Sequence, residues 1–340
     1  MRIPRSSTAM RGAAIGLVAL AALLFPIVRP DDLYRQTVIY LIFLLAVEAV
    51  GWNIIAGFTG YVSLGQSAFL GLGAYTVGIL SMHVGISPLV LAPLGGVVAA
   101  IVAAILGLTI MRAREHAFVI ITIAFLFLMQ AIGLNARGFT GGSNGITLPL
   151  PGWNPDLGNL PFYYLQFLLV VLSILMSWWI RRSKLGMGLI AIREDEDKAA
   201  AIGVRTSVYK VLAFVASGVL VGVAGSIHAY FLTFIDPRGM FDIFVSVQIV
   251  LAVLIGGRGT VWGPILGAFI VVPMNEMANS VTTGEGVRLF VFGLALAAVV
   301  LFLPLGVIPT VRNLLARRRA GAVAFERRPT ATAVPARAAE

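Results

Sequence analysis

Few residues of this sequence belong to types that do covalent chemistry or bind metals. The chain has no cysteine, which excludes disulfides, thiolate metal sites and cysteine nucleophiles and leaves its redox compartment undetermined. The three histidines, His83, His116 and His228, stand far apart and form no HExxH motif or histidine–carboxylate cluster. The sequence also lacks a Walker A motif, a nucleophile elbow and a paired-carboxylate site. We therefore expect no catalytic residue, no metal and no cofactor.

Two carboxylates stand inside long apolar runs, where ionisable groups are costly and are candidates for function. Glu48 lies in the middle of its run, with Asn53 a turn and a half later. Glu276 follows Asn275 near the end of its run, where reaching water is easy, which weakens the same argument for it. Glu48 and Asn53 are therefore candidates to line a pathway through the apolar region.

Uncharged polar residues open another apolar run, in the segment TGYVSLGQSAFLGLGAY at 59–75. Ser63, Gln66 and Ser67 come close together there, and such groups cost free energy in hydrocarbon unless they face water or polar partners. They either line a wet face of a helix or hydrogen-bond to neighbouring helices. Gln248, in a short apolar run after Asp242, is a further candidate for the same pathway.

One stretch, residues 181–210, has the composition of a soluble protein surface, and within it lies AIREDEDKAAAIGV at 191–204. Four acidic residues gather where a helix would begin, and Gly203 stands where a left-handed cap would end it. We expect a helix of two or three turns. Its side chains Ala199, Ala200, Ala201 and Ile202 are too small to build a core of their own but suit close docking in a groove of another protein. The alternative is a solvated helix that merely connects two spans.

Composition places the whole chain in a membrane. Apolar residues make up 59% and charged residues 12% of the 340, and the mean hydropathy is +0.95. In soluble domains about 45–50% of the residues are apolar and about 25% are charged. The formal net charge of +10 is carried by residues that interrupt apolar runs instead of lining a folded face. We therefore expect membrane lipids, and no nucleic acid, as a partner of these charges.

Apolar runs close to the length of a membrane-spanning helix recur along the chain. They cover residues 12–28, 37–56, 62–82, 88–111, 117–134, 162–180, 210–235, 243–255, 261–278 and 287–303. The first resembles a signal peptide, but no small-residue cleavage site follows, so we count it as a span. The fold class expected is all-α, a polytopic bundle of about ten membrane helices. Gly218, Gly222 and Ser226 repeat at a spacing that lets helices pack closely, as do Gly263 and Gly267.

The distribution of basic residues predicts the topology. With both termini cytoplasmic, 20 of the 25 Lys and Arg residues fall on the inner side. The segment 181–210 is then cytoplasmic and the segment 135–161 external. We divide the chain into a head, first span and external loop at 1–36, the main membrane domain at 37–310, and a basic disordered cytoplasmic tail at 311–340, which we expect to lie against anionic headgroups.

Five segments, spread in order over residues 44–269, carry a resemblance to a known family. They are FTGYVSLGQSAFLGLGAY from Phe58, TGGSNGI from Thr140, LGMGLIAIREDEDKAAAIGV from Leu185, YKVLAFVASGVLVGVAGSIHAY from Tyr209 and LIGGRGTVWGPILGA from Leu254. Together they resemble the branched-chain amino acid ABC transporter permease family, LivM type. The first 36 residues and the tail after Thr310 carry none of its motifs.

The resemblance implies one of the two membrane subunits of an importer in the bacterial inner membrane. Its partners would be a LivH-like sister permease, two cytoplasmic ABC ATPase subunits and an external substrate-binding protein. Residues 191–204 would be the coupling helix, which docks in the ATPase cleft. Residues implied to make charge-assisted contacts there, or to allow the close fit, are Arg193, Glu194, Asp195, Ala199, Ala200 and Gly203. ATP-driven closure would push on this helix and tilt the bundle.

Alternatives to this interpretation remain open. Permeases for urea, short-chain amides and other amino acids are similar in the same motifs, so the substrate is undetermined. An ion-coupled secondary carrier would explain Glu48, but it would leave the docking-type helix unexplained and would favour inverted repeats, of which there is no clear trace. A passive channel would need no such helix either.

Overall fold

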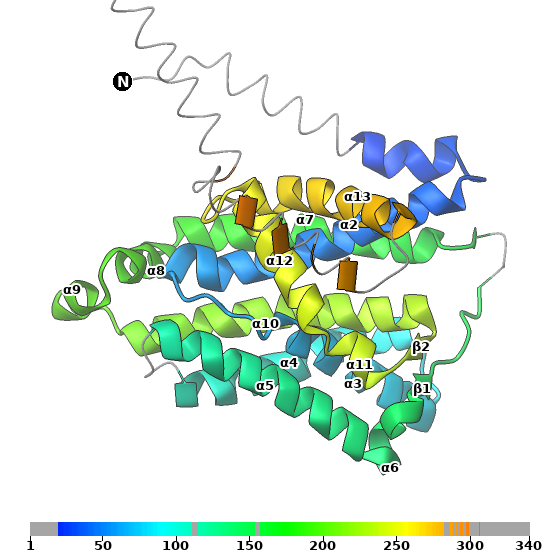
Figure 1. The fold of residues 1–340 in the computed structure, drawn as a ribbon, viewed down its shortest axis with the longest axis horizontal. Coiled ribbons are helices and arrows are strands. Elements are labelled where there is room, and N and C mark those ends of the chain that lie inside the picture. The colour runs from blue at the N-terminus through cyan, green and yellow to red at the C-terminus, as the bar shows by residue number, and fades with distance from the viewer. Residues whose placement is uncertain are drawn as a thin grey trace, which may run out of the picture.

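The computed structural model describes residues 20–110, 115–153 and 157–281, together with 286, 287, 290, 293, 294, 297, 298 and 306. The described chain is almost entirely helical, as expected (Figure 1). Its long helices are α2 (Leu33–Trp52), α3 (Gln66–Val84), α4 (Pro88–Ile110), α5 (Glu115–Asn135), α7 (Leu160–Arg182), α10 (Thr206–Leu232), α12 (Ile243–Gly256) and α13 (Gly263–Val281). Shorter ones are α6 (Arg137–Thr140), α8 (Lys184–Glu194), α9 (Glu196–Ala201) and α11 (Pro237–Met240).

Within the described residues, seven helices are long and apolar enough to span a membrane. An eighth apolar helix, Gly263–Ala278, is shorter. The expected first span is described only at residues 20–28, which are helical, and most of the expected last span at 287–303 lies outside the described residues. The chain is thus a multi-pass helical membrane protein, and the total of ten helices stays a prediction.

The bundle is built around α2 and α10. In their most apolar windows 83% and 67% of the residues are buried, against 33%, 28% and 39% in α4, α5 and α7. Figure 1 shows α10 between two groups of helices, with α2, α7 and α13 on one side and α3, α4 and α5 on the other. Because α4, α5 and α7 are apolar on their exposed faces too, those faces suit contact with lipid.

The glycine repeat on α10 makes the packing seam that its spacing indicates. A Cβ added to Gly73 would overlap the carbonyl oxygen of Gly222, and one added to Gly222 would lie 2.8 Å from the carbonyl oxygen of Gly95. The hydroxyl of Ser226 donates to the carbonyl of Gly73 at 3.0 Å. Helices α3, α4 and α10 therefore approach so closely that backbone meets backbone.

Two breaks interrupt the helical ladder inside the bundle. A π-helical turn, Asn53–Gly57, ends α2, and the non-helical residues 60–65 then lead to α3. The expected span at 62–82 thus begins later, at Gln66, because Gly60 has a φ of +92°, which a right-handed helix does not adopt, and the indole of Trp52 donates to the carbonyl of Ser63 at 2.6 Å. The second break, at Phe241 and Asp242, separates α11 from α12.

The short helices and strands lie at the two opposite ends of the bundle (Figure 1). One end carries α8 and α9. The other carries α6, α11 and a two-stranded antiparallel sheet, β1 (Ile146–Thr147) with β2 (Phe234–Ile235), in which Ile146 faces Ile235 and Thr147 faces Phe234. This separation agrees with the alternation expected for segments 135–161 and 181–210. Which end faces the cytoplasm stays a prediction, and both termini lie outside the described residues.

Candidate functional site

The polar stretch at 181–210, called the island below, contains two short helices, α8 and α9, where the sequence suggested one helix starting at the acidic cluster. Asp195 is extended, with φ −167° and ψ 111°, and its carboxylate accepts the backbone N–H of Lys198 at 3.0 Å, which makes it the N-cap of α9. Arg193 and Glu194 consequently form the last turn of α8. Gly203 has φ +91° and ends α9, as its position indicated.

The predicted docking residues fall on different faces of this island. Ala200 and Gly203 are exposed, Glu194 has 73% of its side chain exposed, and Asp195 is partly exposed. Ala199, by contrast, is 2% exposed, because a helix of six residues laid on the bundle must bury one face. It is therefore unavailable for the close fit expected of it. Ile202, from the same group of expected docking side chains, is 78% exposed beside Gly203.

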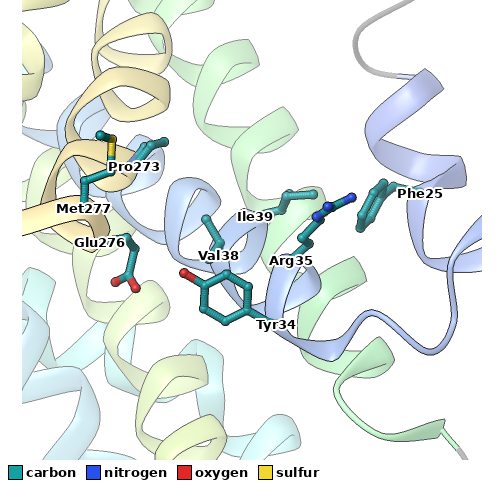
Figure 2. Close-up of a pocket in the computed structure, with 8 residues that line it drawn as sticks. All are labelled: Phe25, Tyr34, Arg35, Val38, Ile39, Pro273, Glu276 and Met277. Carbon is teal, nitrogen blue, oxygen red and sulfur yellow. The ribbon is translucent and has the colours of Figure 1, made fainter. Parts of the chain in front are cut away.

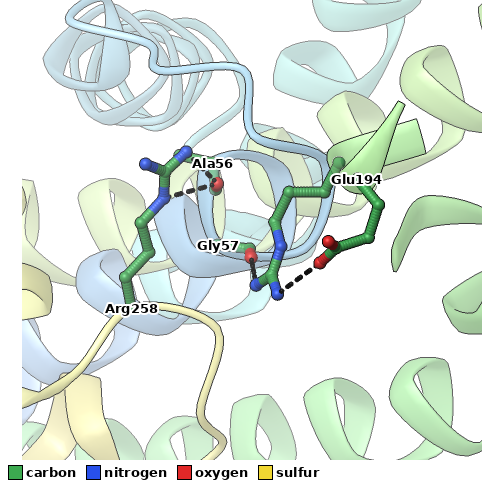
Figure 3. A network of polar contacts seen from close by, with 5 residues as sticks. Ala56, Gly57, Glu194 and Arg258 are labelled. Atoms are coloured by element: carbon green, nitrogen blue, oxygen red, sulfur yellow. Dashed lines mark hydrogen bonds and ion pairs between the residues drawn. The ribbon is translucent and has the colours of Figure 1, made fainter. Parts of the chain in front are cut away.

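Arg193 is turned toward the bundle. Its Nη1 donates to the carbonyl oxygen of Gly57 at 3.0 Å, and its Nη2 lies 3.4 Å from Glu194 Oε1 (Figure 3). The π-helical turn leaves this carbonyl available at the end of α2. Arg193 thus ties α8 to α2, whereas the sequence had suggested a contact with a partner protein.

A buried ion pair fastens α9 to the foot of α10. The ammonium of Lys210, which is 2% exposed, lies 2.7 Å from Oε1 of Glu196 and 3.2 Å from the hydroxyl of Tyr61. The Tyr61 hydroxyl donates to Oε2 of Glu196, and the Lys210 ammonium also lies 4.3 Å from the centre of the Tyr61 ring. We call Tyr61, Glu196 and Lys210 the latch. A charge this deeply buried is tolerated only when it is paired and hydrogen-bonded.

The latch favours the ionised form of Glu196. Partial burial opposes ionisation, but hydrogen bonds from Lys210 and Tyr61, the attraction of the Lys210 charge and a hydrogen bond from Thr206 outweigh it. The pKa of Glu196 therefore lies below its usual value. Sequence reasoning missed all three latch residues as a unit: Lys210 counted only as an inner-side charge, and Tyr61 only as part of a motif. Tyr61 lies 135 positions from Glu196 and 149 from Lys210, so no local sequence signal indicates that the three meet.

The loop between α12 and α13 closes the same end of the bundle. Arg258 donates from Nε and Nη2 to the carbonyl of Ala56 at 3.0 and 2.9 Å (Figure 3). Its Nη2 also donates to the carbonyl of Gly60 at 2.6 Å. Asn53, predicted to line a pathway, is fully buried and bonds this loop: its side chain accepts the N–H of Gly259 at 2.8 Å and donates to the carbonyl of Thr260 at 2.9 Å.

The other pathway candidates lie inside the bundle and mostly bond to neighbouring helices. The amide of Gln66 donates to Ser217 of α10, and Ser67 and Ser246 of α12 lie 3.0 Å apart. Ser63 is equally buried, and its hydroxyl accepts the N–H of Gly65 at 3.3 Å. Of the two interpretations, the contacts of these side chains match bonding between elements of the chain. A role in transport for them stays a prediction.

Three polar side chains in the bundle call for separate description. Glu48 is 2% exposed, and its Oε1 has no hydrogen-bond partner. Oε1 of Gln66 is likewise buried and unpaired, although the amide nitrogen is bonded. Gln248 is partly buried on α12. Glu48 is therefore the candidate that the fold leaves least satisfied.

An open groove of about 360 Å³ lies between the start of α2 and the end of α13 (Figure 2). Its walls are mostly apolar, with Arg35 and Glu276 among them. Glu276 thus lies toward the end of the bundle opposite α9, as its sequence position indicated. Among the described residues, no group of three or more His, Asp or Glu side chains could hold a metal ion.

This arrangement defines a multi-pass membrane protein with two interrupted helices and a short exposed helix fastened beside one interruption. The chain belongs to the family described as branched-chain amino acid transport system / permease component, whose model matches residues 34–303. It is therefore a transport permease, and the resemblance noted in its motifs is confirmed.

Individual relatives agree with this assignment. The chain is 29% identical over 307 residues to the high-affinity branched-chain amino acid transport system permease protein LivM of Salmonella typhimurium, a match that covers 83% of this chain and 70% of the relative. It is 28% identical, with the same coverage, to LivM of Escherichia coli. A shorter match, 29% over 140 residues, covers 40% of this chain and 42% of the autoinducer 2 import system permease protein LsrC of Photorhabdus laumondii. No solved structure matches the chain.

Proposed function

We propose that this chain is the membrane subunit of an ATP-driven importer in the bacterial inner membrane, and that α9 with Ile202 and Gly203 is the docking site of an ABC ATPase subunit. The observation that carries this proposal is the pairing of an exposed outer face, Ala200, Ile202 and Gly203, with an inner face locked into the bundle through Glu196 and Lys210. A helix that only connected two spans would need neither. The α9 end of the bundle is then cytoplasmic.

Docking at this site would rest on a small apolar contact surrounded by charge. Ile202 offers the largest apolar side chain on the outer face, and burying an exposed side chain of this kind against a partner is favourable. Glu194 and Asp197 flank it and are exposed, so they suit a basic rim on the ATPase. Ala199 is buried and Arg193 is bonded to Gly57, so the proposed contact rests on neither of them.

The substrate we propose is a branched-chain or related amino acid, because the LivM relatives carry that description. The remaining partners follow from the same likeness: a LivH-like sister permease and an external substrate-binding protein. Urea, short-chain amides and other amino acids are the competing substrates. Each is distinguished by direct uptake measurements, with the binding protein supplying the first selection.

The experiment that tests the proposal uses vesicles containing the complete transporter, with and without ATP inside the compartment that holds the ATPases. Uptake of radiolabelled leucine is compared between the unaltered chain and Ala200→Arg, which places a bulky charge on the docking face at a helical position without backbone strain. Lys184→Met, at an exposed residue at the start of α8, is the matched control. Co-purification of the ATPase subunit measures docking separately from uptake.

We expect uptake to require ATP, and Ala200→Arg to lose both the ATPase subunit and at least about tenfold of the uptake, while Lys184→Met keeps both. Uptake without ATP, unaffected by Ala200→Arg, would overturn the proposal. The ion-coupled carrier rests on one observation, the unpaired Oε1 of Glu48. It requires uptake driven by an imposed ion gradient alone and abolished by Glu48→Gln.

A further inference from the structure

The backbone connections of α9 transmit force poorly. On its N-terminal side, Asp195 is extended and separates α9 from α8. On its C-terminal side, residues 202–205 are non-helical before α10 begins. Neither junction continues a hydrogen-bonded helical ladder. A displacement of α9 therefore reaches the bundle mainly through side chains that join α9 directly to other elements.

The latch is a hydrogen-bonded and charged connection of this kind, in addition to the apolar contact of the buried Ala199. Glu196 belongs to the first turn of α9, Lys210 to the foot of α10, and Tyr61 to the non-helical segment that leads into α3. The other ion pair of α9, between Lys198 and Asp195 at 2.9 Å, joins α9 only to its own cap and is exposed. The latch thus binds α9 to two separate parts of the bundle.

The segment that contains Tyr61 is stiff. The Thr59 hydroxyl donates to the carbonyl of Ile55 at 2.6 Å, and the Trp52 indole holds the carbonyl of Ser63. Further along, the N–H of Leu64 donates to the hydroxyl of Thr122 on α5 at 3.2 Å. These bonds restrict the segment at successive points and tie it to α2 and α5, so a displacement of Tyr61 is passed on to the residues that follow and to these helices.

This segment ends deep in the bundle. Lys210, Phe214 and Ser217 lie along one face of α10, and seven residues of helix span about 10.5 Å. Lys210 contacts Tyr61, Phe214 packs edge-on against Phe69 at 5.1 Å, and Ser217 accepts from Gln66. Residues 61–66 therefore follow α10 inward by about two turns, and the first turn of α3 meets α12 through Ser67 and Ser246.

We propose that the latch is the transmission point of the transporter, which passes movement of the docked α9 to residues 61–66 and so to the junction of α3 and α12. This inference rests on the proposed docking of an ATPase at α9. Tyr61, Glu196 and Lys210 are positioning residues: they touch neither nucleotide nor substrate. Breaking the latch leaves the ATPase docked and hydrolysing ATP, but its movement no longer drives the interior of the bundle.

The test measures ATP hydrolysis and leucine uptake on the same vesicles, with co-purification of the ATPase subunit as the readout of docking. The variants are Lys210→Met, which removes the buried charge at similar size, and Tyr61→Phe, which keeps the ring over Lys210 but loses both hydroxyl hydrogen bonds. The exchanged pair Glu196→Lys with Lys210→Glu restores opposite charges at the two positions. The control is Lys184→Met, which alters an exposed lysine at the start of α8.

We expect Lys210→Met to keep the ATPase subunit and to keep ATP hydrolysis within about twofold, while uptake falls at least about tenfold. The ratio of ATP hydrolysed to leucine taken up then rises, more for Lys210→Met than for Tyr61→Phe, and the exchanged pair lowers it again. A merely structural latch would lower hydrolysis and uptake together and leave the ratio unchanged. That result in folded Tyr61→Phe would overturn the inference even if Lys210→Met failed to accumulate.

The two proposals fail in distinguishable ways. If Ala200→Arg leaves the ATPase subunit bound, the docking site itself is wrong. If Ala200→Arg releases the subunit but the latch variants leave the ratio of hydrolysis to uptake at the unaltered value, docking stands and the transmission point lies elsewhere.

Discussion

The hydroxyls of Ser67 and Ser246 lie 3.0 Å apart, and the same Ser246 hydroxyl accepts the backbone N–H of Ser67 at 3.1 Å. Two helices that begin inside the bundle, α3 and α12, are thereby joined at their first turns. Both residues are fully buried. The contact holds together the place at which the chain departs twice from regular helix.

Ser246→Ala should destabilise this junction, because it leaves both the N–H and the hydroxyl of Ser67 without their partner. We expect a loss of about 1–2 kcal/mol, measured by thermal unfolding in detergent. Ser67→Ala removes only the hydroxyl contact and should cost less. Equal effects of the two substitutions would contradict the double role assigned to Ser246.

Gly222→Leu should prevent close packing of α10 against α3 and α4. A side chain at this position meets the Cβ of Ala99 and the carbonyl oxygen of Gly95, both within a tightly packed seam. Overpacking costs about 1–3 kcal/mol, and backbone contacts cannot relax, so we expect the upper part of that range or failure to accumulate. Gly138→Ala, where a Cβ meets no atom within 4 Å, is the control and should unfold at the unaltered temperature.

Arg258→Lys should weaken the end of the bundle next to α9. The guanidinium reaches the carbonyls of Ala56 and Gly60 together, and a lysine ammonium does not reproduce this planar fork. We expect a loss of about 2 kcal/mol in the free energy of unfolding. Thermal unfolding, or hydrogen exchange at residues 56–60, measures this loss. Unchanged exchange there would show that the fork is dispensable.

Acid should weaken the latch. Because the pKa of Glu196 is lower in the folded chain than its ordinary value near 4.5, its ionised form stabilises the fold. That stabilisation is complete above the ordinary pKa and is lost as the pH falls through the lowered one. The melting temperature of the unaltered chain should therefore fall more steeply than that of Glu196→Gln as the pH is lowered below 4.5. Parallel curves for the two proteins would contradict this assignment.

Much of the architecture could be predicted from the sequence because hydrophobic runs of membrane length leave little choice of structure. The runs at 88–111, 162–180 and 243–255 match α4, α7 and α12 to within a few residues. The α10 glycine repeat predicted its own packing seam. The Gly203 cap was also predictable, since only the local backbone is involved.

The candidate site was less accessible to sequence reasoning. Asn53, Ser63, Gln66 and Ser67 were recognisable as polar groups needing partners, but the sequence could not distinguish water from a neighbouring helix. The structure supplies protein partners for most of them. The sequence also placed Ala199 at the expected docking contact, because the way a six-residue helix such as α9 lies on its support cannot be inferred from the sequence alone.

By itself the sequence determined that this chain crosses a membrane several times as helices, that it belongs among transport permeases, and where its exposed acidic helix ends. Hydrophobic runs, helix caps and short motifs each consist of residues that are neighbours in the sequence, so they can be recognised without knowing the fold. Only the tertiary structure decided that Tyr61, Glu196 and Lys210 meet, and that Arg258 closes over α2. Those contacts depend on how helices distant in sequence are placed side by side, and a buried charge finds its partner only once that packing exists.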